Sequence, residues 1–411
     1  IASVAESPLD PLVLWVGTDD GNLQVSKDGG KTWTELSANL GAPALSFIDR
    51  IVASGAAKGT AYVSVDNHRS GDFTPYIFRT TDFGKTFTRV TDGLPDGAPV
   101  RSIVEYPGKA HVLFAGTERF LYYTTDSARH WTRVAANLPT TRYDDLIVHP
   151  RTKDLVIGTH GRSIWILDDA SPFAEWTAAL AAKPATLFPV RRATLTYYWQ
   201  DVSTAAHNFY AAENPAEGAT FTYHLAKASP SVKFTVTNAA GKVVRELTGP
   251  GTAGVLQRIN WDLRYAPPAG GGFAFGGGGE EAGGPPAEAG AGGRGGRGGR
   301  GGGRTDMRPP LPIPAHNIGA RGTYVAPGTY TVTMEVDGAK ETRTFEVRSD
   351  PTTPVTAADH KARESFLLEV ADVQARLTAR TTEFRAKLTA ATGDEQARLT
   401  ALAQKLGIGV G

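Results

Sequence analysis

The sequence predicts a mainly β protein: a partial β-propeller in residues 1–170, an immunoglobulin-like β-sandwich after it, and α-helices at the C-terminus. Three observations carry this prediction. A strand-and-turn pattern occurs four times, roughly 40–50 residues apart, which is the spacing of propeller blades. Short strands separated by polar turns follow it. The C-terminal residues show a helical spacing of apolar side chains.

The repeated unit has two parts. The first is a hydrophobic strand that ends in Gly-Thr and an acidic residue or histidine, with one variant that ends in Val-Asp. The second is a tight turn that reads Ser/Thr-x-Asp-x-Gly-x-Thr and closes on an aromatic residue. The strand occurs at 15–19, 61–66, 113–118 and 156–160, and the turn occurs at 26–33, 80–87 and, in a degenerate form, 124–131.

The turn residues have a local structural role. The carboxylates of Asp28 and Asp82 can accept hydrogen bonds from backbone amides of the turn, and a glycine supplies a positive φ at little steric cost. The closing aromatic residues, Trp33, Phe87 and Trp131, are expected to pack between neighbouring blades. We therefore assign these aspartates to the fold and not to a site.

These turns are identified as Asp-boxes, also called bacterial neuraminidase repeats. With Gly17–Gly21, Asp66–Ser70 and Gly158–Asp169, they make residues 1–170 resemble the C-terminal blades of bacterial sialidase-like and sortilin-like propeller proteins. Many such proteins are labelled glycosyl hydrolases, so the resemblance implies a propeller that acts on or binds carbohydrate. The arginine triad and the Tyr–Glu pair of sialidases cannot be assigned in these residues, which argues against sialidase activity.

The blades can be divided into strands, and the ring is expected to continue beyond them. Four blades are fewer than in most propellers, so upstream blades of the same protein are an expected partner. The chain opens within a strand and shows no signal peptide, which predicts a targeting signal upstream and an extracytoplasmic location: secreted, periplasmic or cell-surface. The predicted strands are 1–6, 12–18, 23–26 and 33–36; 48–53, 61–65, 76–80 and 87–90; 101–106, 112–117, 121–125 and 131–134; and 145–149, 155–159 and 163–167.

Polar residues gather in the turns after the second strand of each blade, which places them on one face of the propeller. Glycosidases use two carboxyl groups that flank the scissile bond, and Asp19 or Asp20 with Glu118 can form such a catalytic pair. The alternative is that these carboxylates only shape hairpins or form a solvated ion pair with a neighbour. The substrate-binding candidates on this face are Asp66, His68, Arg69, Arg119, His160 and Arg162.

His160 and Arg162 are separated by Gly161 only, so an imidazole and a guanidinium lie close together at the rim of this face. Such a pair can bind a carboxylate or a phosphate. The alternative is a solvent-exposed histidine without a ligand, which is the commoner situation in turns.

The composition excludes several function classes. With 43 basic and 42 acidic residues, the chain has no net field that recruits nucleic acid or a membrane surface. It contains no cysteine, which excludes disulfides and thiolate chemistry. No apolar run reaches the length of about 18 residues that spans a bilayer. The His, Asp and Glu residues fit no metal template, so neither a metal nor a cofactor is predicted.

After a connector at 171–190, the strand pattern predicts the β-sandwich at 191–350, with Trp261 in its core. A Gly-rich insert at 269–304 has almost no apolar side chains, so it is expected to be a disordered loop; its Arg-Gly-Gly repeats leave RNA binding as an alternative. The segment 351–411 is expected to be helical and to start with a capping box at Thr356. The predicted sandwich strands are 220–225, 232–237, 243–247, 257–263, 328–336 and 341–347.

Two functions remain open at this stage. The first is a secreted glycosidase-like propeller that acts on carbohydrate through Asp19, Asp20 and Glu118. The second is a non-catalytic, sortilin-type propeller that uses the same face to hold a peptide or a glycan. The sequence does not decide between them, because one propeller scaffold serves both functions.

Overall fold

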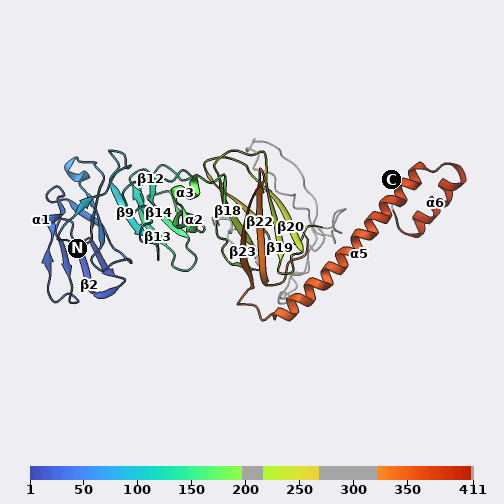
Figure 1. Cartoon of the computed structure of the whole chain (residues 1–411), viewed down its shortest axis with the longest axis horizontal. Coiled ribbons are helices and arrows are strands. Elements are labelled where there is room, and N and C mark those ends of the chain that lie inside the picture. Colours follow the sequence, from blue (N-terminus) through green and yellow to red (C-terminus); the bar gives the residue numbers. More distant parts are fainter. Residues whose placement is uncertain (197–215, 268–321, 409–411) are drawn as a thin grey trace, which may run out of the picture. The chain divides into compact units, whose positions relative to one another are not determined.

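The computed structural model describes residues 1–196, 216–267 and 322–408, and these form two compact units, Ile1–Phe188 and Pro189–Gly411 (Figure 1). The first unit carries all the repeats. The predicted Gly-rich insert, 269–304, lies outside the described residues.

The N-terminal unit consists of successive antiparallel sheets, each built from consecutive strands, as in propeller blades. Three sheets have four strands and the last has three. Every predicted strand is present; three match at both ends, and the others have ends that differ by one or two residues. Blade 1 is β1 (Ser3–Ser7), β2 (Asp10–Gly17), β3 (Leu23–Ser26) and β4 (Thr34–Glu35); blade 2 is β5 (Phe47–Ala53), β6 (Ala61–Asp66), β7 (Tyr76–Thr80) and β8 (Thr88–Arg89); blade 3 is β9 (Val100–Glu105), β10 (Leu113–Thr117), β11 (Leu121–Thr124) and β12 (Thr132–Arg133); and blade 4 is β13 (Tyr143–Val148), β14 (Leu155–Thr159) and β15 (Ile164–Leu167).

This unit also contains shorter elements. Between the blades lies α1 (Ser37–Leu40), and after them lie α2 (Ser171–Glu175), α3 (Ala178–Ala181) and β16 (Ala185–Leu187); η1 (His68–Ser70) lies inside blade 2, between β6 and β7.

Neighbouring blades pack through apolar faces, and the glycine of the Gly-Thr motif permits this packing. A Cβ on Gly17 would lie 2.3 Å from Cγ2 of Ile48, in the first strand of the next blade. A Cβ on Gly116 would lie 2.7 Å from the Cβ of Tyr143, again in the next blade. Side chains at these positions would overlap the neighbouring strand, so the repeated glycine allows the blades to approach closely.

The Asp-box turns confirm the assignment of their aspartates to the fold. Asp28 accepts hydrogen bonds from the amide (2.9 Å) and the hydroxyl (2.6 Å) of Thr32, and Asp82 accepts the same pair from Thr86 at 3.0 and 2.7 Å. The hydroxyl of Thr32 and then its amide lower the pKa of Asp28 to about 2, and the amide of Thr86 and then its hydroxyl lower the pKa of Asp82 to about 2. Both carboxylates are satisfied by the turns that they begin.

The packing prediction for the closing aromatic residues is correct for Trp131 but wrong for Trp33. Trp131 is 1% exposed, and its indole N–H donates to the carbonyl of Val90 in the preceding blade at 2.9 Å. Trp33 is 40% exposed and bonds only within its own turn, to the carbonyl of Gly30. The difference has a plain cause: each such residue packs on the preceding blade, and the described residues contain no blade before blade 1.

The C-terminal unit contains two sheets that pack through aromatic side chains. Phe221 lies 5.7 Å from Phe345 between ring centroids, and Trp261, fully buried as predicted, lies 5.4 Å from Tyr330. The immunoglobulin-like topology itself stays a prediction. One sheet has the order β17 (Ala193–Leu195), β23 (Ala339–Ser349), β22 (Gly328–Val336), β19 (Val232–Asn238) and β20 (Val243–Gly249), with β17 and β23 parallel; in the other, β18 (Ala219–Leu225) and β21 (Leu256–Trp261) pair antiparallel.

The chain ends in two helices, α5 (Ala357–Ala390) and α6 (Gly393–Lys405). The capping box is confirmed: the hydroxyl of Thr356 accepts from the amide of Asp359, and the Asp359 carboxylate accepts from the Thr356 amide. In the described part of the chain, every helix is too short or too polar to cross a lipid bilayer.

Candidate functional site

The candidate site lies at one end of the blades, where β2, β6, β10 and β14 end; we call this end the rim. In blades 2, 3 and 4 the first strand starts at the rim and carries a β-bulge at the same place. The register shift leaves one residue of each strand without a partner: Asp49 in β5, Arg101 in β9 and Asp144 in β13. A bulge turns its extra side chain out of the strand's alternation, so three polar side chains are redirected at the rim.

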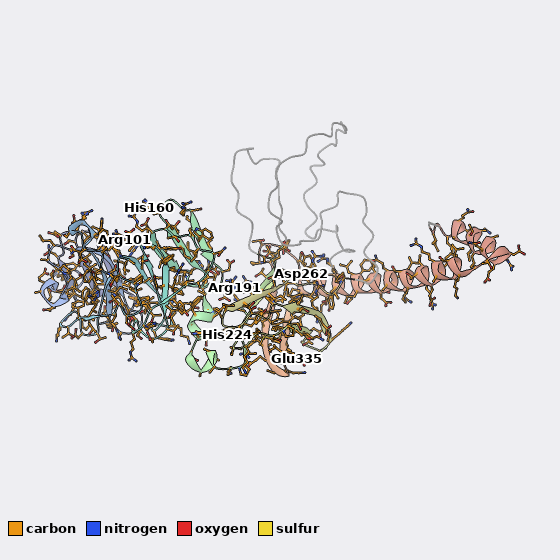
Figure 2. All side chains as sticks on the ribbon, turned by 90° about the horizontal axis from the view of Figure 1, so that it is seen from above. Arg101, His160, Arg191, His224, Asp262 and Glu335 are labelled. Atoms are coloured by element: carbon orange, nitrogen blue, oxygen red, sulfur yellow. The ribbon has the colours of Figure 1, made fainter. Side chains whose placement is uncertain are left out.

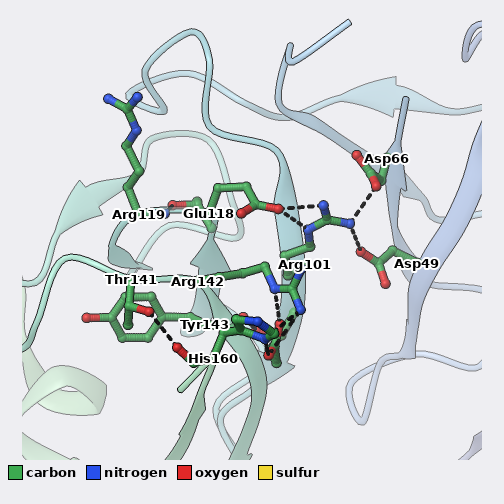
Figure 3. Close-up of polar contacts among 12 residues, drawn as sticks. Asp49, Asp66, Arg101, Glu118, Arg119, Thr141, Arg142, Tyr143 and His160 are labelled. Atoms are coloured by element: carbon green, nitrogen blue, oxygen red, sulfur yellow. Dashed lines mark hydrogen bonds and ion pairs between the residues drawn. The ribbon is translucent and has the colours of Figure 1, made fainter. Parts of the chain in front are cut away.

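Arg101 is the centre of the larger polar cluster, and its guanidinium lies between Glu118 on one side and Asp49 and Asp66 on the other (Figure 3). Its Nε donates to Oε1 of Glu118 at 2.6 Å, and its Nη1 lies 2.5 Å from Oδ2 of Asp66 and 3.4 Å from Oδ2 of Asp49. The ring of His68 also contacts the Asp66 carboxylate. One guanidinium therefore neutralises carboxylates from two blades, with Asp66 almost fully buried.

Asp49 differs from the aspartates of the turns in its proton affinity. Burial raises the pKa of Asp49 to about 6, and the neighbouring Arg101 guanidinium lowers the pKa only in part. A carboxyl group with a pKa in this range can hold a proton in mildly acidic solution and release it near neutrality, which is the property of a general acid or base.

A second polar cluster lies on blade 4. Nη2 of Arg142 is 2.9 Å from Nδ1 of His160, and Nε of Arg142 donates to Oδ1 of Asp144 at 2.5 Å. Oδ2 of Asp144 is 3.2 Å from the same His160 nitrogen, and the hydroxyl of Thr141 donates to the His160 carbonyl at 2.9 Å. Figure 2 labels Arg101 and His160, the central residues of the two clusters, and both lie in the N-terminal unit. The imidazole is thus held through one nitrogen, and its other edge is exposed.

An ion pair joins blades across the site. Arg50 and Asp145 follow two of the bulged residues directly, and Nη2 of Arg50 lies 2.6 Å from Oδ1 of Asp145. Arg50 belongs to β5 of blade 2 and Asp145 to β13 of blade 4, so this contact joins the first strands of two blades that are not neighbours in sequence. The two charges cancel, so the pair adds nothing to the net charge of the rim.

The structure places the predicted catalytic residues in different surroundings. Asp19 and Asp20 are exposed in the turn after β2. Asp20 accepts hydrogen bonds from the hydroxyl of Thr18 and the amide group of Asn22, and the Thr18 contact lowers the pKa of Asp20. Glu118 contacts Arg101 instead, and among the described residues no hydrogen bond or ion pair joins it to either aspartate. Their catalytic role stays a prediction.

The predicted binding residues fall into two groups. Asp66, His68 and His160 belong to the polar clusters described above. The other three are exposed arginines on the same rim: Arg69 lies over the ring of Phe47, while Arg119 and Arg162 have exposed side chains. Figure 3 shows the Arg119 side chain extending away from the Arg101 guanidinium.

The sequence reasoning missed Asp49, Arg101, Arg142 and Asp144 as site residues. A signal for three of them is present in the sequence. The first strands read apolar-polar-polar-apolar, as in Ile48-Asp49-Arg50-Ile51, which departs from strict alternation and is compatible with an extra residue in the strand. Arg142 precedes its strand and offers no such signal.

Within residues 1–196, 216–267 and 322–408, no group of three or more His, Cys, Asp or Glu side chains is placed to hold a metal ion. That neither a metal nor a cofactor takes part stays a prediction for the whole chain.

Comparisons with known proteins agree with the repeat. The family model described as "Sortilin, neurotensin receptor 3" matches residues 75–172, which is less than half of the chain. A search of the curated proteins by sequence finds no match. With the antiparallel sheets and the Asp-box turns, the family match supports a β-propeller with Asp-box repeats in the N-terminal unit.

Solved structures similar to the chain include "YCF48 bound to D1 peptide" (17% identity, 41% of this chain and 52% of that one, TM-score 0.32). They also include an ancestral GH74 enzyme (14%, 61% and 32%, TM-score 0.34) and the GH74 xyloglucanase from Xanthomonas campestris (17%, 40% and 36%, TM-score 0.27). The chain thus spans between about a third and a half of the length of these structures.

Proposed function

We propose that the rim of blades 1–4 binds a carbohydrate and that the protein acts outside the cytoplasm. The observation that carries the proposal is the pair of polar clusters that three β-bulges place at the rim. Sugars are bound through several hydroxyl groups, each of which needs a fixed donor or acceptor. Carboxylates and guanidinium groups held by one another, as around Arg101, are preorganised donors and acceptors of this kind.

Hydrolysis of a glycosidic bond is the second candidate, and the raised pKa of Asp49 favours it. Glycoside hydrolysis needs one carboxyl group that carries a proton and another that is ionised. Asp49 can supply the proton, and the predicted carboxylates, Asp19 or Asp20 with Glu118, can supply the base. In this proposal His160 and Arg162 position the substrate.

Binding of a peptide without chemistry is the alternative. The turn-like contacts of Asp20 support it, since a carboxylate engaged by Thr18 and Asn22 is occupied by its own turn. In that case the exposed arginines would meet carboxylates of the peptide. Upstream blades, if they complete the ring, belong to the same proposal because they would add residues to the rim.

The experiment is a binding and turnover screen of the 411-residue chain. Isothermal calorimetry against oligosaccharides and peptides measures binding, and aryl glycosides measure turnover. Glu118→Gln, Asp19→Asn, Asp20→Asn and Asp49→Asn are compared with Glu246→Gln, a control in the C-terminal unit. Loss of a general acid or base lowers turnover by about 10²–10⁴-fold.

Three outcomes separate the proposals. Oligosaccharide binding that weakens in the rim variants and not in Glu246→Gln supports the carbohydrate proposal. Turnover that collapses in Asp49→Asn or Glu118→Gln adds the hydrolase. Binding of peptides with no affinity for any oligosaccharide would overturn the carbohydrate proposal in favour of the alternative.

A further inference from the structure

Two histidines of the rim, His68 and His160, are held through the same ring nitrogen. Each follows the second strand of its blade, β6 or β14, and each has its Nδ1 between a guanidinium and a carboxylate. In the described part of the chain, no hydrogen bond or ion pair engages Nε2 of either ring. The side chains are 39% and 67% exposed, so Nε2 is the atom that each ring offers to a ligand.

The partner of Nδ1 decides what Nε2 can do. A neutral imidazole carries one proton, on Nδ1 or on Nε2, and the hydrogen-bond network indicates which nitrogen holds it. If Nδ1 donates to a carboxylate, Nε2 keeps its lone pair and is an acceptor. If Nδ1 accepts from a guanidinium, which can only donate, the proton lies on Nε2, which is then a donor.

His68 is held by the carboxylate. Its Nδ1 is nearer to Oδ2 of Asp66 than to Nη2 of Arg101, which lies 3.3 Å away. That Nη2 has a closer acceptor, Oε1 of Glu118, at 2.5 Å. Asp66 is buried and ion-paired with Arg101, and its Oδ1 also accepts from the backbone amide of His68 at 3.1 Å. An ion-paired carboxylate has no proton to give, so Nδ1 of His68 is the donor and Nε2 is left as an acceptor.

His160 is held by the guanidinium. Its Nδ1 lies 2.9 Å from Nη2 of Arg142 and 3.2 Å from Oδ2 of Asp144. The Asp144 carboxylate has a closer donor, Nε of Arg142, at 2.5 Å. Asp144 and His160 therefore both accept from Arg142, around which they gather in Figure 3. This arrangement leaves the ring proton of His160 on Nε2.

We propose that the rim presents two imidazoles of opposite hydrogen-bonding sense. Nε2 of His68 accepts a hydrogen bond from the ligand, and the Nε2–H of His160 donates one to a ligand oxygen. Asp66 and Arg142 are the positioning residues that fix the two tautomers. Hydroxyl groups both donate and accept, so they suit both rings. This choice of ligand group rests on the proposed carbohydrate function, whereas the two tautomers do not depend on it.

The test is nitrogen NMR of the full chain, labelled with ¹⁵N only at its nine histidines. The shifts of Nδ1 and Nε2 are followed to high pH, until they no longer change, and show which nitrogen carries the proton. Substitution of one histidine at a time by glutamine assigns the signals. His149 is an internal reference, because its Nδ1 accepts from the backbone amide of Thr152 at 3.1 Å and its proton is therefore on Nε2.

Three variants of rim arginines test the cause. Arg142→Met removes the donor and leaves the Asp144 carboxylate as the partner of Nδ1 in His160. Arg142→Lys restores a donor at this position. Arg119→Met is the matched control, since Arg119 makes no hydrogen bond or ion pair to either ring within the residues that the structure describes. Thermal unfolding checks that each variant folds, and the comparison of the two rings in the native chain needs no variant.

The expected result is a proton on Nδ1 in His68 and on Nε2 in His160. Arg142→Met should move the His160 proton to Nδ1 in most molecules, and Arg142→Lys and Arg119→Met should leave it on Nε2. The same tautomer in both rings, or a His160 that does not respond to Arg142→Met, would overturn the inference while any calorimetric result stands. Conversely, a calorimetric screen without oligosaccharide binding would overturn the carbohydrate function and leave the two tautomers as they are.

Discussion

The two ends of the blades use aspartate in opposite ways. At the Asp-box end, Asp28 and Asp82 make the same contacts to residues four positions away, so each blade repeats a closed local unit. At the rim, the corresponding positions of successive blades hold different residues, and their contacts reach other blades, as between Arg101 and Asp66. Local, repeated contacts build the fold, whereas variable positions with long-range contacts are where a scaffold carries its function.

Of the changes that test this difference between the two ends, removal of Arg101 should lower the free energy of unfolding most. Arg101→Ala leaves the carboxylates of Asp66, Asp49 and Glu118 close together without their common cation. Breaking a buried ion pair on one side costs about 3–5 kcal/mol of unfolding free energy. Urea unfolding of the full chain measures this free energy. Arg101→Lys keeps the charge but loses the planar guanidinium, so its unfolding free energy should lie between those of the native chain and Arg101→Ala. If Arg101→Ala lowers the free energy of unfolding by no more than an ordinary surface substitution does, the cluster does not stabilise the fold.

The next effect compares two glycines at the same position of the repeat. Gly116→Ala puts a methyl group 2.7 Å from Tyr143 and should destabilise the unit by about 1–3 kcal/mol, the cost of overpacking. Gly158→Ala puts a methyl group in ordinary van der Waals contact with Asp145, at 3.6 Å or more, and should change stability by less than about 0.5 kcal/mol. Thermal unfolding of both variants measures the difference. Equal losses would show that blade packing does not explain the repeated glycine.

The same difference between local and long-range contacts decides which features could be predicted from the sequence. The alternation of apolar residues and the Asp-boxes predicted the strands of all four blades, because both are local signals. The capping box at Thr356 and the burial of Trp261 were predicted for the same reason. The partner of Glu118 could not be predicted: the polar pair Arg101-Ser102 in the strand is compatible with an extra residue, but it does not show which side chain the redirected Arg101 contacts.

The exposure of Trp33 was mispredicted for a different reason. The local pattern gives its turn and its direction correctly, but burial depends on a neighbouring blade. Trp33 and Trp131 occupy the same position of the repeat. Trp131 is covered by the blade that precedes its own, and the described residues contain no such blade for Trp33.

A smaller effect concerns the acid stability of the Asp-box end. The pKa of Asp82 falls from 3.8 to about 2 on folding, so its turn contributes stability above pH 3.8 that is lost as the pH falls through about 2. Asp82→Asn should remove this dependence while keeping the shape of the turn. Stability measured at steps between about pH 5 and pH 2 tests it, with native protein as the reference. A slope that is the same in both proteins would contradict the assignment.

Asp49 gives the most specific test, because its pKa moves in the opposite direction. Burial raises the pKa of Asp49 from 3.8 to about 6, so the folded chain holds a proton that the unfolded chain has released in this window. Stability should therefore fall as the pH rises from 3.8 to about 6, whereas the Asp82 contribution is already complete there. Asp49→Asn mimics the protonated form and should flatten that fall, becoming steadily more stable relative to the native chain up to about pH 6. If the difference between the two proteins stays constant over this range, Asp49 titrates normally, and the rim loses the carboxyl group that favours hydrolysis.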